Sequence, residues 1–206
     1  MNLPNKLSLL RIILIPFTMI FMLPIHLYGW APEGWNNFIA NHGMLIAAFI
    51  FIVASLTDMA DGKIARKYNL ITNLGKFLDS LADKMLVIAI LIAFVEIGRV
   101  SAWFLMIIVL RELAVTGIRL LASNKGVVMA AKMIGKIKTT TQMIAIVYLM
   151  FEPTIMKLCN FGHVYPLETC WVTVVGDVLF LISVVMTIVS GMDYLLKNLD
   201  YFKDAE

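Results

Sequence analysis

The chain has 206 residues, of which 61% are hydrophobic and 15% are charged. So large an excess of apolar residues argues against a soluble globular domain and predicts an integral membrane protein. The formal charge of +3 is small, and the basic residues stand at the ends of long apolar runs, which argues against a protein that binds nucleic acid.

Six apolar runs follow one another along the chain, and each has the roughly 20 residues that a helix needs to cross a bilayer. They cover about residues 7–28, 43–60, 76–97, 102–121, 132–151 and 171–195. Between the first two runs, the polar and aromatic stretch 29–41 is expected to form an outer loop. With no repeat and no linker, residues 1–206 are predicted to form a single all-α membrane domain of about six transmembrane helices.

The basic residues predict the orientation of this bundle. If the N-terminus is cytoplasmic, 14 of the 17 lysine and arginine residues fall on the inner side: Lys6, Arg11, Lys63, Arg66, Lys67, Lys76, Lys84, Arg119, Lys125, Lys132, Lys136, Lys138, Lys197 and Lys203. Cytoplasmic segments carry such an excess. We therefore expect a multi-pass protein of the cytoplasmic membrane with both termini in the cytoplasm.

Four carboxylates near the second and third runs form two pairs. Asp58 and Asp61 are three residues apart, and Asp79 and Asp83 are four apart, so each pair shares one face of a helix. Carboxylates at this spacing repel one another unless a cation neutralises them. Oxygen ligands favour Mg²⁺ or Mn²⁺, and two pairs predict two ions. The alternative is a solvated, charged loop between two helices.

The depth of these charges favours a functional site. At 1.5 Å per residue, Asp58, Asp83 and Lys136 each lie about 21–22 Å from the outer ends of three different runs. That depth is just below the inner edge of a hydrocarbon core about 30 Å thick. Charges buried there are costly unless they line a polar cavity, so we expect a pocket that faces the cytoplasm.

The stretch from Asp58 to Asp83 resembles the signature of the CDP-alcohol phosphotransferase family, D-x2-D-G-x2-A-R-x8-G-x3-D-x3-D. All fixed positions match: Asp58, Asp61, Gly62, Ala65, Arg66, Gly75, Asp79 and Asp83. The resemblance implies an enzyme that moves a phosphatidyl or similar group from a CDP-linked donor, such as CDP-diacylglycerol, to an alcohol and releases CMP. It also implies a homodimer.

Roles for individual residues follow from this resemblance. Asp58, Asp61, Asp79 and Asp83 would hold the metal ions, and Asp83 would also act as the general base. The CDP-linked donor would be bound by Asp58, Gly62, Arg66 and Gly75. The opening segment resembles the N-terminus of the family branch that uses glycerol 3-phosphate, which would place Asn5 and Arg11 near the mouth of the active site. The alternative is that this segment only anchors the chain among lipid headgroups.

Polar residues of the fourth and fifth runs indicate which acceptor the protein uses. Glu112, Thr116 and Arg119 share a helix face. Together with Lys136 and Lys138, Arg119 would form a basic pocket for glycerol 3-phosphate, as in the same family branch. The alternative for Lys138 is a basic belt that contacts anionic lipid, because it points about 200° away from Lys136. Arg111, near mid-membrane, is expected to pair inside the bundle with an acid from another helix.

Other functions remain open at this point. The acceptor could be inositol phosphate or serine, and a divalent-cation transporter is a more distant alternative, although basic residues beside the acids disfavour it. No serine or cysteine stands beside a histidine, so we expect the acceptor to attack phosphorus directly. Cys159 and Cys170 both fall in an expected outer loop, where a disulfide is conceivable.

Overall fold

The computed structural model describes residues 3–25, 31–67, 73–124, 133–159 and 170–197, and within these ranges it contains helices and no strand. The six long helices are α1 (Leu3–Met22), α3 (Met44–Lys67), α4 (Asn73–Glu96), α5 (Ala102–Asn124), α6 (Met133–Leu158) and α7 (Trp171–Leu196). A short helix, α2 (Glu33–Phe38), and a π-helical turn, η1 (Ile39–Gly43), lead directly into α3. The prediction of an all-α fold is confirmed.

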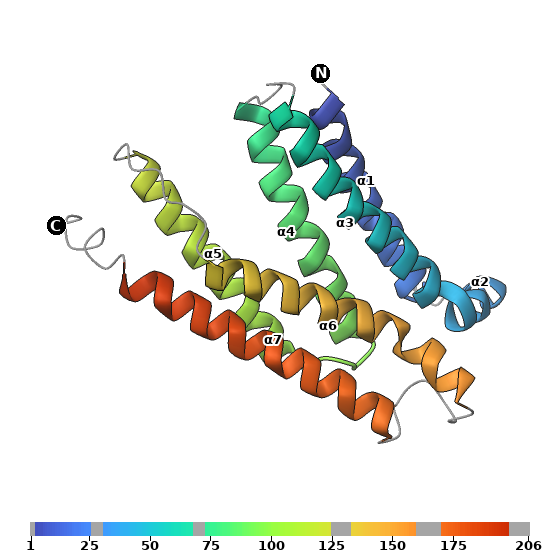
Figure 1. Ribbon diagram of the computed structural model, residues 1–206. Coiled ribbons are helices and arrows are strands. Elements are labelled where there is room, and N and C mark those ends of the chain that lie inside the picture. Colours follow the sequence, from blue (N-terminus) through green and yellow to red (C-terminus); the bar gives the residue numbers. More distant parts are fainter. Residues whose placement is uncertain (1–2, 26–30, 68–72, 125–132, 160–169, 198–206) are drawn as a thin grey trace.

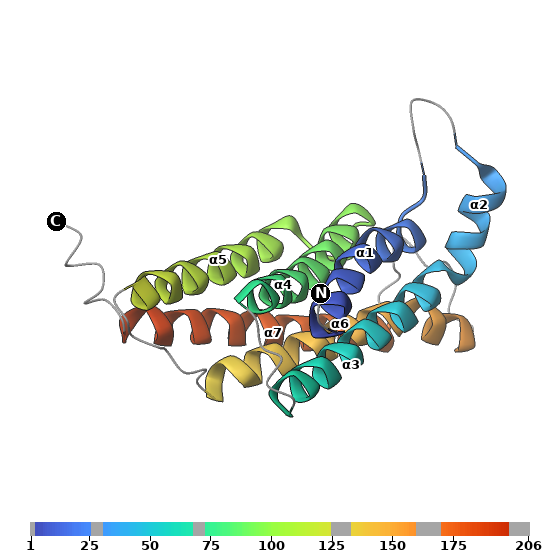
Figure 2. The same cartoon turned by 90° about the horizontal axis from the view of Figure 1, so that it is seen from above.

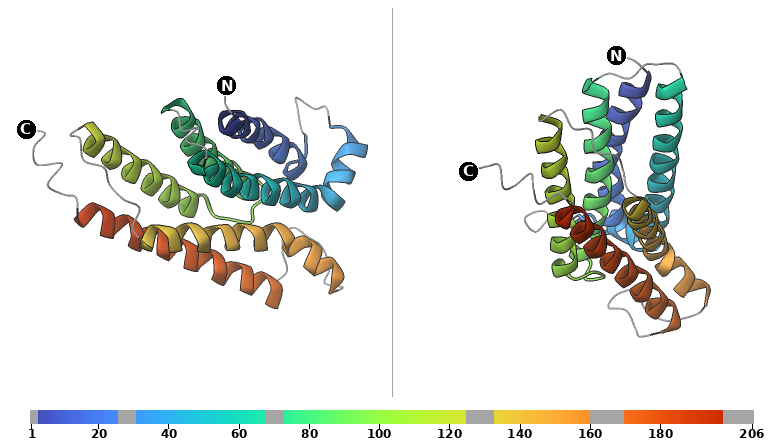
Figure 3. Two further views of the ribbon diagram at one scale, coloured as in Figure 1. Left: turned by 45° about the horizontal axis from the view of Figure 1, so that its top comes forward. Right: turned by 60° about the vertical axis from the view of Figure 1, so that its left-hand side comes forward.

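The helices form two groups that cross (Figure 1). In one group α1 packs against both α3 and α4; in the other α6 packs along α7, which also contacts α5. Contacts of α3 with α6 and of α4 with α5 join the groups, as Figures 2 and 3 show from other sides. The shared core is fully apolar at its centre, where the buried residues include Phe51, Ile90, Phe94, Ile108, Ile146 and Leu149.

The outward faces of the long helices are also apolar. Large hydrophobic side chains exposed on them include Phe49, Val53, Leu110, Leu113, Val178, Leu181 and Val185. Among the described residues, two helical segments are long and apolar enough to cross a membrane: Glu33–Thr57, which runs from α2 through η1 into α3, and Trp171–Leu196. A bundle that is apolar both inside and outside has the pattern expected of a protein surrounded by lipid.

Five of the long helices begin within about three residues of the predicted runs, but α3 and α6 each extend seven residues beyond the predicted ends at 60 and 151. The first helix differs at both ends. It covers Leu3–Met22, rather than residues 7–28. Its C-terminal end stands just before Pro24, which disfavours helical geometry in the residue that precedes it. The first helix therefore begins and ends earlier than its hydrophobicity predicts.

The predicted outer loop at 29–41 is wrong for its described part, because α2 and η1 make it helical. Trp35 lies between the rings of Phe21 and Phe38, with centroids 5.8 and 5.9 Å away. The Asn36 side chain both accepts a hydrogen bond from the Ile25 amide and donates one to its carbonyl. These contacts, which hydropathy does not report, hold the segment against the end of α1.

Candidate active site

The acidic signature spans the C-terminal half of α3 and the N-terminal half of α4. Asp58, Asp61, Gly62 and Arg66 belong to the helical backbone of α3, but the surroundings of Gly62 and the side chains of the other three lie outside the described part of the structure. The same holds for the side chain of Asn5 in α1. The roles of these five residues therefore stay predictions. The described side chains of the acidic signature are those of α4.

Asp79 and Asp83 lie one turn apart on α4 and are both exposed. The carboxylate of Asp79 faces α1, where the buried guanidinium of Arg11 approaches it to 3.4 Å. Gly75, one turn before Asp79, is half-buried. Arg11 thus lies beside the acidic cluster. This position favours the prediction that the N-terminal segment borders the active site over the alternative that it only anchors the chain among lipid headgroups.

Asp83 lies where this acidic cluster meets a second group of charges. It interacts electrostatically with Arg11 and Asp79 on one side and with Glu112 and Lys138 on the other. The first two residues belong to α1 and α4, whereas the last two belong to α5 and α6. One exposed carboxylate is therefore within the field of charges from four helices.

A cleft of about 710 Å³ opens beside Asp83 between α4, α5 and α6. Five cationic and two anionic side chains contribute to its wall, together with polar and apolar residues: Asp83, Lys84, Val87, Ile88, Ile108, Arg111, Glu112, Val115, Thr116, Arg119, Gly135, Lys136, Lys138, Thr139, Thr140 and Gln142. Its volume suits a small organic ligand. The excess of positive charge suits an anion.

The cations of the cleft include all three residues predicted for the acceptor pocket. Arg119 is exposed, and its guanidinium lies over the ring of the buried Tyr194, 5.6 Å from the centroid. The Lys136 ammonium is exposed and makes no hydrogen bond or ion pair with a described residue. Lys84 also lines the cleft and donates a 2.6 Å hydrogen bond to Thr116. It was not among the predicted site residues, although its position next to Asp83 in the sequence could have indicated it.

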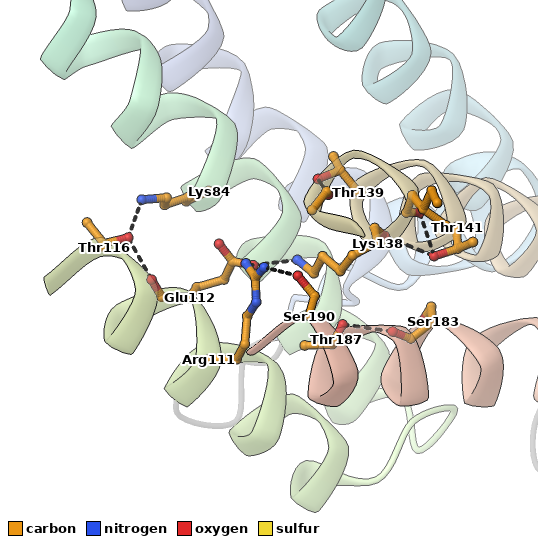
Figure 4. Close-up of polar contacts among 12 residues, drawn as sticks. Lys84, Arg111, Glu112, Thr116, Lys138, Thr139, Thr141, Ser183, Thr187 and Ser190 are labelled. Carbon is orange, nitrogen blue, oxygen red and sulfur yellow. Dashed lines mark hydrogen bonds and ion pairs between the residues drawn. The ribbon is translucent and has the colours of Figure 1, made fainter. Parts of the chain in front are cut away.

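Lys138 differs from the other two because it is buried and forms an ion pair with Glu112 (Figure 4). Lys138 and Lys136 point in different directions from α6, and the side chain of Lys138 points into the bundle. The alternative that Lys138 belongs to a basic belt in contact with lipid is therefore wrong. Arg111 donates a 3.0 Å hydrogen bond to the same Glu112 and a 2.6 Å bond to Ser190 of α7. Arg111 was expected to pair with an acid from another helix. Its acidic partner is instead Glu112, the next residue on α5, and α7 contributes the hydroxyl of Ser190.

The carboxylates fit a divalent metal by their chemistry. Among the described side chains no group of three potential metal ligands comes together, since only Asp79 and Asp83 of the predicted four are described. Two carboxylates one helical turn apart supply hard oxygen ligands, which suit Mg²⁺ or Mn²⁺. Asp79 and Asp83 could thus form half of such a site.

A second polar cluster lies at the opposite end of the bundle. Arg99, in the turn between α4 and α5, bonds to the fully buried Glu152 of α6 at 2.8 Å and to Asp177 of α7 at 2.6 Å. Burial alone would lower the pKa of Arg99, but both carboxylates raise it above its ordinary value. A Cβ at Gly176 would lie 2.9 Å from this guanidinium. Nearby, Cys159 and Cys170 are both free thiols, so the conceivable disulfide is not formed.

Known proteins are similar to this chain over nearly its whole length. A family model described as CDP-alcohol phosphatidyltransferase matches residues 1–189. The CDP-diacylglycerol–glycerol-3-phosphate 3-phosphatidyltransferase of Bacillus subtilis (strain 168) is 43% identical over 99% of this chain and 98% of its own length. Proteins of the same name from Salmonella typhimurium (strain LT2) and Shigella flexneri are 33% and 34% identical over 94% of this chain and 93% of theirs.

Proposed function

The chain belongs to the CDP-alcohol phosphatidyltransferase family, and we propose that it transfers the phosphatidyl group of CDP-diacylglycerol to glycerol 3-phosphate. The products are phosphatidylglycerol phosphate and CMP, so the enzyme acts in phospholipid synthesis. In the reaction the terminal hydroxyl oxygen of the acceptor forms a bond to the phosphatidyl phosphorus. The bond between that phosphorus and the oxygen of the CMP phosphate breaks, and the hydroxyl proton goes to a base.

The observation that carries the choice of acceptor is the cationic cleft beside Asp83. Glycerol 3-phosphate is a small dianion, and Lys84, Arg119 and Lys136 would meet its phosphate with charge-assisted hydrogen bonds. A neutral acceptor such as serine or free inositol has no phosphate for these cations to bind. Inositol phosphate would fit the charges, and therefore remains the competing acceptor within the family.

Asp83 is the residue that we assign as general base. Its carboxylate is exposed at the wall of the cleft, so an acceptor hydroxyl can come within the roughly 3 Å that proton transfer requires. Arg11 and Lys138 both lie close enough to interact electrostatically with this carboxylate. Lys138 is held by Glu112, so its part in binding the acceptor phosphate is secondary to that of Arg119 and Lys136.

Two divalent ions, Mg²⁺ or Mn²⁺, would be held by Asp58, Asp61, Asp79 and Asp83. Bound there, they would neutralise the charge of the pyrophosphate and of the leaving CMP. We assign the CDP end of the donor to Asp58, Gly62, Arg66 and Gly75 on the strength of the family signature, and to Asn5 because the N-terminal segment resembles that of the same family branch. Arg66 suits this role because a guanidinium binds phosphate through two parallel hydrogen bonds.

We also place the protein in the cytoplasmic membrane, with six spans, both termini in the cytoplasm and the active site facing the cytoplasm. Support comes from the distribution of lysine and arginine and from the apolar outer faces of the long helices. A homodimer is the oligomeric state that the family resemblance implies.

An acceptor screen tests the proposed function. Purified protein in detergent is supplied with CDP-diacylglycerol and Mg²⁺, and CMP release and lipid product are measured with glycerol 3-phosphate, inositol phosphate, serine and inositol. Glycerol 3-phosphate should give the highest kcat/KM, and its product should be phosphatidylglycerol phosphate. A preference for any other acceptor, or no CMP release with all four, would contradict the proposal.

A further inference from the structure

One wall of the cleft carries polar groups that the reaction as described does not use. Glu112 accepts the hydrogen bonds of both Arg111 and Lys138 on a single oxygen, Oε1. Its second oxygen, Oε2, accepts no hydrogen bond from the described residues, although Lys84 acts on the carboxylate electrostatically. In Figure 4 the two oxygens of this carboxylate diverge, one toward Arg111 and Lys138 and the other away from them.

Gln142 faces the same cleft from the opposite helix. Its side chain is 97% buried (3% exposed), and its Nε2 atom has no hydrogen-bond partner among the described residues. It follows Lys138 by one helical turn on α6, so the two share a face. Gln142 and Glu112 both line the cleft, from α6 and α5 respectively.

A buried donor without a partner, such as Gln142 Nε2, is costly, and native proteins satisfy such groups. An unused acceptor on α5 and an unused donor on α6 complement a hydroxyl group, which both donates and accepts a hydrogen bond. A second phosphate oxygen would suit Gln142 but would be repelled by Glu112. The pair therefore discriminates in favour of a neutral hydroxyl.

We propose that Glu112 and Gln142 form a hydroxyl subsite, in which Glu112 Oε2 accepts from, and Gln142 Nε2 donates to, the central hydroxyl of the glycerol acceptor. This inference rests on the proposed function, since it assigns one further part of the same substrate. The cations Lys84, Arg119 and Lys136 bind the phosphate at one end of the acceptor, the subsite binds the middle, and the terminal hydroxyl is thereby directed to Asp83. Glu112 also keeps Lys138 and Arg111 out of competition for the phosphate.

The test compares glycerol 3-phosphate with 3-hydroxypropyl phosphate, which lacks only the central hydroxyl and keeps both the phosphate and the reacting alcohol. Loss of a hydrogen bond to an ionised partner should lower kcat/KM of the wild-type enzyme by about 10- to 100-fold. Gln142→Leu should lose most of this discrimination, because it lowers kcat/KM for glycerol 3-phosphate and leaves the value for the analogue within about threefold of wild type.

Thr140→Val is the matched control. Thr140 lines the cleft two residues before Gln142, but its hydroxyl is already bonded to the Lys136 carbonyl at 3.0 Å, so the variant should keep the wild-type discrimination. If Gln142→Leu does not fold, Gln142→Asn withdraws the amide by one methylene and should also reduce the discrimination.

The subsite would be overturned if the wild type used both acceptors equally, or if the Gln142 variant retained the full preference for glycerol 3-phosphate. Either result leaves the proposed function intact, because glycerol 3-phosphate is still consumed. Absence of CMP release with both acceptors contradicts the proposed function itself.

Discussion

The charges around Asp83 bear on its proposed role as a base between the proposed metal site and the cationic cleft. Arg11 and Lys138 act on it from opposite sides, and each is itself bound to an acid, Asp79 or Glu112. Positive and negative charges therefore alternate through the site. Such alternation limits the repulsion among neighbouring carboxylates while leaving the Asp83 oxygens exposed for substrate.

Arg119 and Lys136 should determine affinity for the acceptor phosphate. Arg119→Ala and Lys136→Ala each remove one charge-assisted contact, so each should raise the KM for glycerol 3-phosphate by about 10- to 100-fold. The KM for CDP-diacylglycerol should stay near wild type, because the donor is assigned to the other side of Asp83. Steady-state kinetics with one substrate varied at a time give both values.

Lys157→Ala is a suitable control for these variants. This lysine lies at the far end of α6, where its ammonium bonds to the Asn41 carbonyl at 3.1 Å, and its loss removes the same charge from the protein. An unchanged KM for glycerol 3-phosphate in both cleft variants would remove the phosphate assignment, while the carboxylate site would be unaffected.

Lys138 should contribute to stability as well as to the cleft. Lys138→Met leaves the half-buried Glu112 with one cation in place of two, and loss of one partner from a buried ion pair costs about 3 kcal/mol. Its unfolding midpoint in detergent should therefore be lower than that of Lys136→Ala, whose lysine makes no ion pair with a described residue. The double variant Glu112→Gln/Lys138→Met should recover part of the loss. Equal midpoints for Lys138→Met and wild type would contradict the role of the pair.

At the scale of single helices, α5 shows how far periodicity alone can predict a site. Glu112, Thr116 and Arg119 were predicted to share a face, and all three line the cleft. The same helix turns Arg111 and Val115 toward α7 as well, where Ser190 and Tyr194 meet it. The face follows from residue spacing, but its partners depend on how α5, α6 and α7 cross, which the sequence of α5 does not contain.

Other features could not be predicted because they depend on contacts between distant segments. The helical α2 and η1 replace a predicted loop, and a Cβ at Gly43 would lie only 2.1 Å from the Phe21 carbonyl oxygen of α1. This close approach requires glycine at position 43, but the sequence around Gly43 does not indicate that Phe21 packs against it. The contacts of Arg99 with Glu152 and Asp177 likewise join residues 53 and 78 positions apart.

The turn between α4 and α5 should be a stabilising element without a catalytic part. Arg99→Leu leaves Glu152 buried without its cation, which should cost about 3–5 kcal/mol of stability. Asp177→Asn should cost less than about 1 kcal/mol, because its side chain is mostly exposed and Glu152 keeps its partner. Thermal unfolding in detergent should rank the two variants in this order. Folded protein of either variant should keep the wild-type KM for glycerol 3-phosphate, and a raised KM would connect this end of the bundle to the cleft.

Across the whole molecule, the charges that we propose to serve the reaction lie toward one end, away from Arg99, and the proposed metal site among them can be tested by removing divalent ions. Chelation of divalent ions should abolish activity, and added Mg²⁺ or Mn²⁺ should restore it. Asp58→Asn, Asp61→Asn and Asp79→Asn should each lose most of kcat while the protein elutes from size-exclusion chromatography as wild type does. Full activity in excess chelator would refute the metal requirement, and Asp177→Asn provides a carboxylate control outside the site.

The two ends of the bundle should face opposite sides of the membrane, and the free thiols provide a way to measure this. Cys159 is exposed just beyond α6, at the end of the bundle where Lys157 contacts Asn41, whereas Lys6 is exposed near the start of α1. With the N-terminus in the cytoplasm, a membrane-impermeant maleimide should label Cys159 of a Cys170→Ser variant in intact cells. In a background without either native cysteine, Lys6→Cys should react only after the cells are opened, because the reagent cannot cross the bilayer. Labelling of Lys6→Cys in intact cells, together with protection of Cys159, would invert the topology and would place Asp83 and its cleft on the side of the membrane that lacks CDP-linked donors.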